Sequence, residues 1–264
     1  MLLQKNFSFF LLLLPLLLIA CSGSKESEIK TAEDRFNYGK ELFDDEKYLE
    51  AIPQFDIVRL QYQGSSVSDK AQYYTGMARF HHEDYLLAAY DFELLIRNYP
   101  SSVLVPDAYF MIAQSYVKKS PPAPLDQTYT YRALEALQTF IELYPTHARV
   151  PEAQKHQADL INRLAQKEFE TGVLYEKMEN PKAALISYDR VLDQYYNSDY
   201  GDDALVAKIR IVIRRKKNSE AQKLIEMFFK KFPTSPLQPE VEQMQRVLSL
   251  NGFDQTTLKS ETHN

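Results

Sequence analysis

The sequence is short of cysteine and glycine, and each shortage argues against a particular kind of structure. Its 264 residues include one cysteine, Cys21, so no disulfide can form within the chain. Only seven glycines are present, and alternation of β-branched with polar residues is weak, so the chain is not expected to build sheets. The composition therefore favours an all-α fold.

Positive charge is not in excess either. The chain holds 31 basic and 36 acidic residues, and removal of residues 1–20 leaves 30 basic and 36 acidic residues, a formal balance of −6. A net acidic chain is not expected to bind nucleic acid non-specifically, because the phosphate backbone repels it. We therefore expect no nucleic acid among its partners.

Motifs for catalysis and for metal binding are missing as well. There is no Gly-rich phosphate loop, no G-x-S-x-G and no H-E-x-x-H. His81 and His82 are adjacent and cannot share a helical face, while His147 and His156 stand nine residues apart. We predict no enzyme activity, no catalytic or metal site and no cofactor. A helical enzyme is the alternative, and it would need a buried acid or histidine that this pattern does not supply.

What the sequence does have begins at the N-terminus. Lys5 is followed by an almost wholly apolar segment, residues 7–20, which is too short to span a bilayer. The segment ends in Leu18-Ile19-Ala20-Cys21, which is typical of a bacterial lipobox. That resemblance implies cleavage before Cys21 and acylation of this residue. Two or more acyl chains bind a membrane stably, so Cys21 is predicted to be the lipid anchor.

Three other interpretations of this segment are weaker. A soluble secreted protein could be cut after Ser22-Gly23-Ser24, where small residues suit an ordinary signal peptidase. An uncleaved membrane anchor is disfavoured by the short span. A structural or catalytic thiol is disfavoured because Cys21 would then sit inside the signal region.

A period of 37 residues organises the rest of the chain. Small or apolar residues recur at this spacing, and an alanine follows twelve residues after four of them, with Ala133 delayed by eight residues in the third unit. The first set is Gly39, Gly76, Ala113, Gly172 and Ile209; the alanines are Ala51, Ala88, Ala133, Ala184 and Ala221. Four positions beyond the alanines stand Phe55, Phe92, Leu137, Tyr188 and Ile225, and three further stand Val58, Leu95, Phe140, Val191 and Phe228.

This pattern has a mechanical reason in paired helices. We expect each small residue to face the alanine of its partner helix, so that the two helix axes approach closely. Pro100, Pro145 and Pro233 end three of the units, because proline cannot continue a helix. The period predicts a right-handed superhelical stack of about five tetratricopeptide-like helix pairs.

Two departures from the period are informative. The third unit carries a proline-rich insertion at 119–127, and some fourteen further residues separate Ala113 from Gly172. Between Pro151 and Lys177 only Gly172 could break a helix, so one long helix is predicted there. The expected organisation is a signal peptide at 1–20, a polar tether at 21–31, repeats 1 to 3 at 32–145, the long helix with repeats 4 and 5 at 146–248, and a disordered tail at 249–264.

Taken together, the lipobox, the tether and the repeats resemble the BamD family, the lipoproteins of the outer-membrane β-barrel assembly machine. The resemblance also rests on Cys21-Ser22-Gly23-Ser24-Lys25-Glu26, on Asp126-Gln127-x-Tyr129-x-x-Arg132-Ala133, and on Arg163-Leu164-Ala165-Gln166-Lys167-Glu168. It implies a scaffold anchored by lipid in the outer membrane and facing the periplasm. Its implied partners are the central barrel-forming subunit, docked on the C-terminal repeats, and unfolded outer-membrane protein precursors, bound by the N-terminal ones.

Two places are candidates for partner binding. Residues 208–217 form the densest basic cluster, in which Arg210, Arg214 and Lys217 share a helical stripe that could dock an acidic patch. The alternative is a solvated helix end whose charge matches the helix dipole. In the proline-rich insertion, Leu125 and Gln127 could project toward a partner, or the insertion could be a passive spacer.

A different class of function is also compatible with a lipid-anchored repeat protein. Such a chain could organise cell-wall synthesis or division partners in the periplasm. Proteins of that kind often carry a coiled coil or an added catalytic domain, and this sequence shows neither. The assembly scaffold is therefore the preferred prediction.

Overall fold

The computed structural model describes residues 30–261, with side chains described up to residue 250. Over that part of the chain it contains eleven α-helices and no strand, so the prediction of an all-α chain of helix pairs is confirmed. Two compact units are present, one ending at Asp84 and one beginning at Tyr85. Cys21 and the predicted signal peptide lie outside the described residues.

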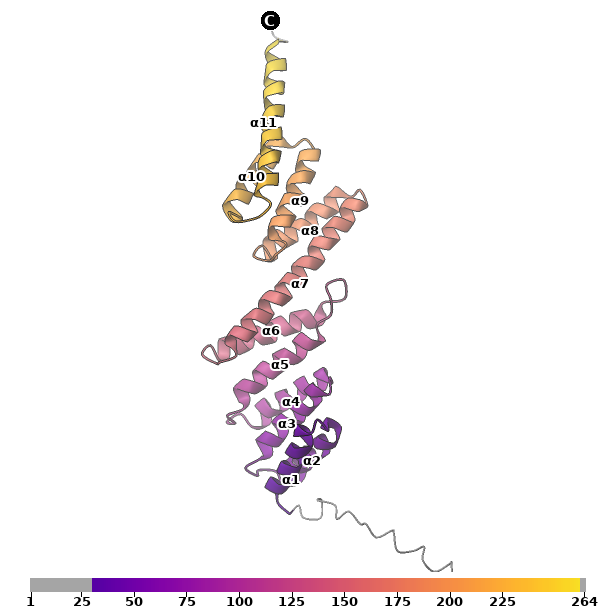
Figure 1. The fold of residues 1–264 in the computed structure, drawn as a ribbon, viewed down its shortest axis with the longest axis vertical. Helices are drawn as coiled ribbons and strands as arrows, with labels where there is room; N and C mark the ends of the chain where they lie inside the picture. The colour runs from indigo at the N-terminus through magenta and orange to yellow at the C-terminus, as the bar shows by residue number, and fades with distance from the viewer. Residues whose placement is uncertain (1–29, 262–264) are drawn as a thin grey trace, which may run out of the picture. The chain divides into compact units, whose positions relative to one another are not determined.

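The first unit contains α1 (Ala32–Asp44), α2 (Tyr48–Gln61) and α3 (Ser68–His81), shown in indigo to purple in Figure 1. A capping box starts α1: the Thr31 hydroxyl accepts from the Asp34 amide at 3.0 Å, and the Asp34 carboxylate accepts from the Thr31 amide at 3.1 Å. The interaction of the Asp34 carboxylate with the Thr31 side chain, followed by its hydrogen bonds from the Lys30 and Thr31 amides, lowers the pKa of Asp34. Helices α1 and α2 pack together, as do α2 and α3.

The second unit contains the remaining eight helices, and each packs on the next along the chain. In order they are α4 (Tyr85–Asn98), α5 (Val105–Lys119), α6 (Thr128–Leu143), α7 (Val150–Lys177), α8 (Pro181–Gln194), α9 (Gly201–Arg214), α10 (Asn218–Lys231) and α11 (Gln238–Glu261). The division between the units falls between α3 and α4, inside the second sequence repeat.

The periodic residues form the core. The five alanines and the ten larger apolar residues that follow them at the fixed offsets are all 0% exposed. Each fully buried Phe, Leu or Val contributes about 1.5 to 3 kcal/mol, so these fifteen positions account for much of the driving force for folding. The repeat pattern read from the sequence is therefore a pattern of burial.

Two glycines of the repeats lie against aromatic rings of the partner helix. A Cβ at Gly39 would meet the Phe55 ring at 2.8 Å, and one at Gly172 would meet the Tyr188 ring at 2.4 Å. The absence of a side chain at these two positions therefore makes room for a ring that stands four residues after the periodic alanine.

Four of the turns inside helix pairs share one geometry. Glu46, Glu83, Glu179 and Lys216 all have φ between 55° and 68°, and each follows the C-cap of the preceding helix. At the first of them, the Lys47 amide donates to Leu42 O at 2.8 Å and the Glu46 amide donates to Phe43 O at 3.0 Å. This is a Schellman cap, in which a left-handed residue is usually glycine. Here the position is held by glutamate or lysine.

The turns between helix pairs repeat as well. An aromatic residue occupies the C-cap of α2, α6, α8 and α10, and its amide donates to the last turn of the helix. Tyr99 plays the same part after α4. The carbonyl of each aromatic residue then accepts from the amide three residues on, as Tyr99 does from Ser102 at 2.9 Å. The sequence identified only the prolines that follow three of these aromatic residues.

The long helix predicted between the third and fourth pairs is α7, which has 28 residues. Its first half contacts α6, where Gln157 donates to Gln138 at 3.0 Å. Its second half contacts α8, and Figure 1 shows α6 and α8 beside successive parts of the α7 ribbon. Near its middle, Asn162 makes two hydrogen bonds with Asp199, of 2.8 and 3.0 Å, which hold the turn between α8 and α9. Helix α7 therefore positions α6 along its first half and α8 along its second half.

The C-terminal segment contains the last helix, α11, which continues to Glu261. The disordered tail at 249–264 stays a prediction. No proline follows Pro239, and nothing in this stretch prevents the helix from propagating. On α11, Val241 and Leu248 are buried against the last pair, while Glu242 and Arg246 form an exposed i,i+4 pair. Helix α11 thus caps the core with a polar outer face.

Candidate partner-binding surfaces

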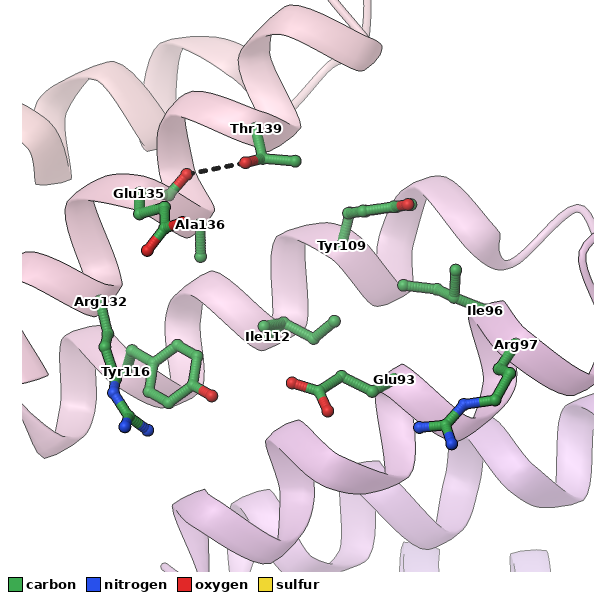
Figure 2. A pocket seen from close by; sticks show the side chains of 10 residues that line it. All are labelled: Glu93, Ile96, Arg97, Tyr109, Ile112, Tyr116, Arg132, Glu135, Ala136 and Thr139. Carbon is green, nitrogen blue, oxygen red and sulfur yellow. Dashed lines mark hydrogen bonds between the residues drawn. The ribbon is translucent and has the colours of Figure 1, made fainter.

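A groove crosses the first three helices of the second unit. Helix α5 supplies its floor with Tyr109, Ile112 and Tyr116. Helix α4 contributes Glu93, Ile96 and Arg97 to one wall, and α6 contributes Arg132, Glu135, Ala136 and Thr139 to the other. Its volume is about 460 Å³, which lies within the range typical of ligand-binding pockets in proteins. We call it the α4–α6 groove, and Figure 2 shows its lining.

One end of the α4–α6 groove is an aromatic stack. The rings of Tyr116 and Tyr129 lie 6.5 Å apart at an interplanar angle of 18°. The Arg132 guanidinium lies 5.7 Å from the centre of the Tyr129 ring, a cation–π distance. This contact restricts the Arg132 side chain while leaving its donors exposed to a ligand.

The sequence did not identify the α4–α6 groove as a candidate. Tyr109, Ile112 and Tyr116 do follow helical spacing, which places them on one face of α5. That spacing by itself also describes a core stripe. Only the packing of α4 and α6 on either side of α5 shows that this stripe forms the floor of a groove.

The proline-rich insertion is held tightly against α7. The Arg163 guanidinium donates to Ser120 Oγ at 2.8 Å and to the carbonyls of Ser120 and Pro121 at 3.2 Å. One turn later, the Lys167 ammonium donates to Leu125 O at 2.6 Å. The insertion is therefore a fixed projection from the pair α5 and α6.

Its two predicted binding residues have different environments. Gln127 is only 5% exposed, and its amide donates to Pro122 O, Ala123 O and Leu125 O while accepting from Thr130 at 2.6 Å. These contacts give Gln127 a structural role inside the turn. Leu125 is 57% exposed and is a large apolar side chain that the turn presents to solvent.

The predicted basic stripe on α9 is engaged within the fold. Arg210 donates through Nε to Glu240 at 2.8 Å, Arg214 pairs with Glu176, and Lys217 pairs with Glu220 at 2.7 Å. The first two pairs connect α9 to α11 and to α7. Helix α9 ends at Arg214, and Lys217 is the N-cap of α10, so its pair with Glu220 lies within the first turn of α10. The prediction that Lys217 shares a helical stripe with Arg210 and Arg214 was therefore wrong, because the left-handed turn at Lys216 separates them. All three cations remain about half exposed or more, so their outer faces are still accessible.

The buried side chain of Tyr188 joins the ion pair between Arg214 and Glu176. The Tyr188 hydroxyl donates to Glu176 at 2.8 Å, and Glu176 in turn pairs with Arg214, so that α8, α7 and α9 are joined. Burial of Tyr188, followed by its hydrogen bond to Glu176, raises its pKa well above the ordinary value of 10.0. The network ties the predicted stripe to the core of the fourth pair.

Two features are absent from the described residues. Within the described part, no cluster of three or more His, Cys, Asp or Glu side chains has the arrangement of a metal site. His81, one of the histidines considered, stacks on Tyr48 with ring centres 5.3 Å apart. No helix among residues 30–261 is both long and apolar enough to cross a bilayer.

Comparison with known proteins places the chain among lipoproteins. The family model "YfiO: Outer membrane lipoprotein" matches residues 29–223. The chain is 26% identical over 229 residues to the outer membrane protein assembly factor BamD of Rickettsia prowazekii, a match covering 85% of this chain and 90% of the relative. For the protein of the same name from Caulobacter vibrioides, identity is 25% over 209 residues, which cover 77% of this chain and 68% of the relative. A solved TPR repeats protein from Bacteroides fragilis aligns over 84% of this chain and 99% of its own at 15% identity, with a TM-score of 0.46.

Proposed function

The chain belongs to the YfiO family of outer membrane lipoproteins, and on that premise we propose that it is a lipid-anchored scaffold of the outer-membrane β-barrel assembly complex. In this role it helps to recruit barrel precursors and to insert them into the outer membrane. The observation that carries the proposal is the extent of the match, which runs from residue 29 into the start of α10 and so includes four complete helix pairs and the first helix of the fifth. Relatives that match over most of their length are named as assembly factors.

The anchor in this proposal is Cys21. The lipobox spacing supports acylation of its sulfur and new amino group, and the polar residues after it supply a tether of about ten residues before α1 begins. A scaffold held in this way faces the periplasm, where barrel precursors arrive unfolded. The helix pairs supply rigid surfaces, because their core positions are fully buried.

The central barrel-forming subunit is the proposed partner of the C-terminal pairs. Arg210, Arg214 and Lys217 support this assignment through their exposed outer faces, although each also holds an acid within the fold. Leu125 offers a second contact on the fixed proline-rich turn. Gln127 contributes indirectly, by keeping that turn in shape.

Two experiments test the assembly role. Depletion of the protein is expected to lower the levels of many outer-membrane proteins together, and pull-down from detergent-solubilised envelope is expected to recover a large barrel protein with periplasmic domains. Unchanged outer-membrane protein levels, or recovery of division proteins alone, would contradict the proposal. Cys21→Ser is expected to release the protein from the membrane while its circular dichroism spectrum stays the same, and full membrane retention of this variant would exclude the lipid anchor.

A further inference from the structure

The arginines of the α4–α6 groove are placed differently from those of α9. Arg97 and Arg132 are both exposed, and neither forms an ion pair within the described residues. Glu93 and Glu135, on opposite walls, likewise have no cationic partner there. Four unpaired charges around one groove can be neutralised by a ligand of complementary charge. The attraction is strengthened because apolar walls focus the electrostatic field of these charges. The charges of the α9 stripe are already offset by acids of the fold.

The four charges have a definite order. Figure 2 shows Arg132 beside Tyr116 at one end of the groove and Arg97 near Ile96 at the other. Ile112 lies on the floor between them, with Glu93 and Glu135 contributed by the opposite walls. From one end to the other, the groove therefore presents the positive charge of Arg132, the negative charge of Glu93 and the positive charge of Arg97 above an apolar floor, with Glu135 near the Arg132 end. A complementary ligand has the order negative, positive, negative.

The dimensions favour an extended chain. A helix 10 to 12 Å across fills roughly 500 Å³ in each 5.4 Å turn, so a groove of about 460 Å³ holds about one turn. The seven residue steps from Tyr109 to Tyr116 span roughly 10 Å along α5. In an extended peptide, side chains at i, i+2 and i+4 share a face and the outer two lie roughly 13 Å apart. Three alternate side chains of an extended segment therefore match the length of the floor.

We propose that the α4–α6 groove binds an extended peptide segment of a partner protein, in which a basic residue lies between two acidic residues on one face. The outer carboxylates pair with Arg97 and Arg132, and the central cation pairs with Glu93. The aliphatic part of the central side chain covers Ile112, which is 9% exposed. The stacked Tyr129 ring holds Arg132 ready for a carboxylate, which reduces the entropy lost on binding.

The test uses the purified full chain and two fluorescent ten-residue peptides of Val and Thr. One peptide carries Glu, Lys and Glu at its third, fifth and seventh positions, and the other carries Lys, Glu and Lys there. Fluorescence anisotropy at about 50 mM salt is expected to show tighter binding of the Glu-Lys-Glu peptide, and the preference should fade at high salt because the rim is exposed. Arg97→Glu with Arg132→Glu is expected to weaken that binding at least about tenfold.

A charge swap gives the sharper result. Adding Glu93→Lys and Glu135→Lys to the two arginine reversals inverts the groove, and this variant is expected to prefer the Lys-Glu-Lys peptide. The matched control is Lys155→Glu with Lys223→Glu, which changes the net charge equally at exposed positions of α7 and α10 outside the groove. Circular dichroism and thermal melting confirm folding, and Arg97→Ala with Arg132→Ala replaces the reversals if these fail to fold.

Three outcomes would overturn the proposal. Equal binding of both peptides by the wild type shows that the order of charges is not recognised. An equal loss in the control variant shows that only bulk charge matters. A wild-type dimer in sedimentation that the groove reversals abolish shows that a second copy occupies the groove. Because binding is measured on the purified chain, none of these outcomes bears on the assembly role.

Discussion

The Tyr188 ring lies against the backbone of Gly172, so closely that a Cβ at Gly172 would come within 2.4 Å of Tyr188 Cε1. The ring is fully buried and its hydroxyl is held by Glu176 at 2.8 Å, so it cannot swing away. The distance between α7 and α8 therefore depends on the absence of a side chain at one position. The same relationship joins Gly39 to Phe55 in the first unit.

Gly172→Ala is expected to destabilise the protein by about 2 kcal/mol. Overpacking a core costs about 1 to 3 kcal/mol. Alanine gains up to about 1 kcal/mol over glycine in helix propensity, which offsets only part of the steric cost of a contact this short. Urea unfolding measures the change. In a Tyr188→Leu background the ring is gone, so the same substitution should be neutral or stabilising. An equal loss in both backgrounds would show that the ring is not the cause.

Glycine is expected to stabilise the Schellman turns. Glu179→Gly and Lys216→Gly should each raise the free energy of unfolding by roughly 0.5 to 1 kcal/mol, because a side chain in the left-handed region is strained and glycine is not. Arg215→Gly is the control: this residue has φ −81°, so glycine there relieves no strain and should not stabilise. Thermal or urea unfolding of the three variants distinguishes the two cases, and a destabilised Lys216→Gly would refute the argument.

The proline-rich turn is expected to depend on Gln127 and not on Leu125. Gln127→Ala removes four hydrogen bonds inside a buried turn and should cost about 2 kcal/mol, with faster protease cleavage between residues 120 and 127. Arg163→Ala should produce the same cleavage by releasing the turn from α7. Leu125→Ser leaves these contacts intact and should unfold like the wild type. Loss of stability in Leu125→Ser would mean that this side chain packs in the turn.

Stability is expected to fall at alkaline pH. Burial, followed by a hydrogen bond to Glu176 for Tyr188 and to Tyr131 for Tyr195, raises both tyrosine pKa values. The unfolded state therefore loses these protons first. The stabilisation is fully present below pH 10, the ordinary tyrosine value, and is lost as pH rises toward the folded-state pKa. Urea unfolding between pH 9 and 11.5 should show the decline, and Tyr188→Phe should make it shallower. An unchanged slope in Tyr188→Phe would exclude Tyr188 as its source.

The arginines at the end of α9 are expected to differ in how much they stabilise the fold. Arg214→Glu places a carboxylate beside Glu176 and is expected to cost about 1 kcal/mol, whereas Arg215→Glu should cost less because Arg215 pairs with no acid in the described part of the chain. If the stripe docks the partner subunit, Arg210→Glu with Arg214→Glu should also reduce co-purification while the protein remains folded. Unchanged co-purification would leave these arginines with their internal role alone.

Much of the fold followed from particular residues in the sequence. The fixed spacing of Phe55, Phe92 and Tyr188 predicted the core, because burial on one face of a helix recurs with the repeat. The absence of helix breakers in residues 151–177 predicted α7. The polar composition of residues 249–264 predicted a disordered tail, but composition does not indicate how far α11 extends.

The candidate sites were harder to predict, for a physical reason. Helical spacing puts Arg210 and Arg214 on one stripe, but it says nothing about Glu240 and Glu176, which come from other helices. It likewise cannot show that Gln127 turns inward, since an amide can hydrogen bond to solvent as readily as to a carbonyl. Pairing across helices is a tertiary property.

The sequence alone determined the helical class, the period and the buried positions, because each depends on local spacing and on residue size. Only the tertiary structure decided that Gly172 makes room for the Tyr188 ring, that the α9 cations are paired, and that Arg97 and Arg132 are left unpaired at the two ends of one groove. These are contacts between residues far apart in the chain. They depend on which helices become neighbours, which no periodic pattern specifies.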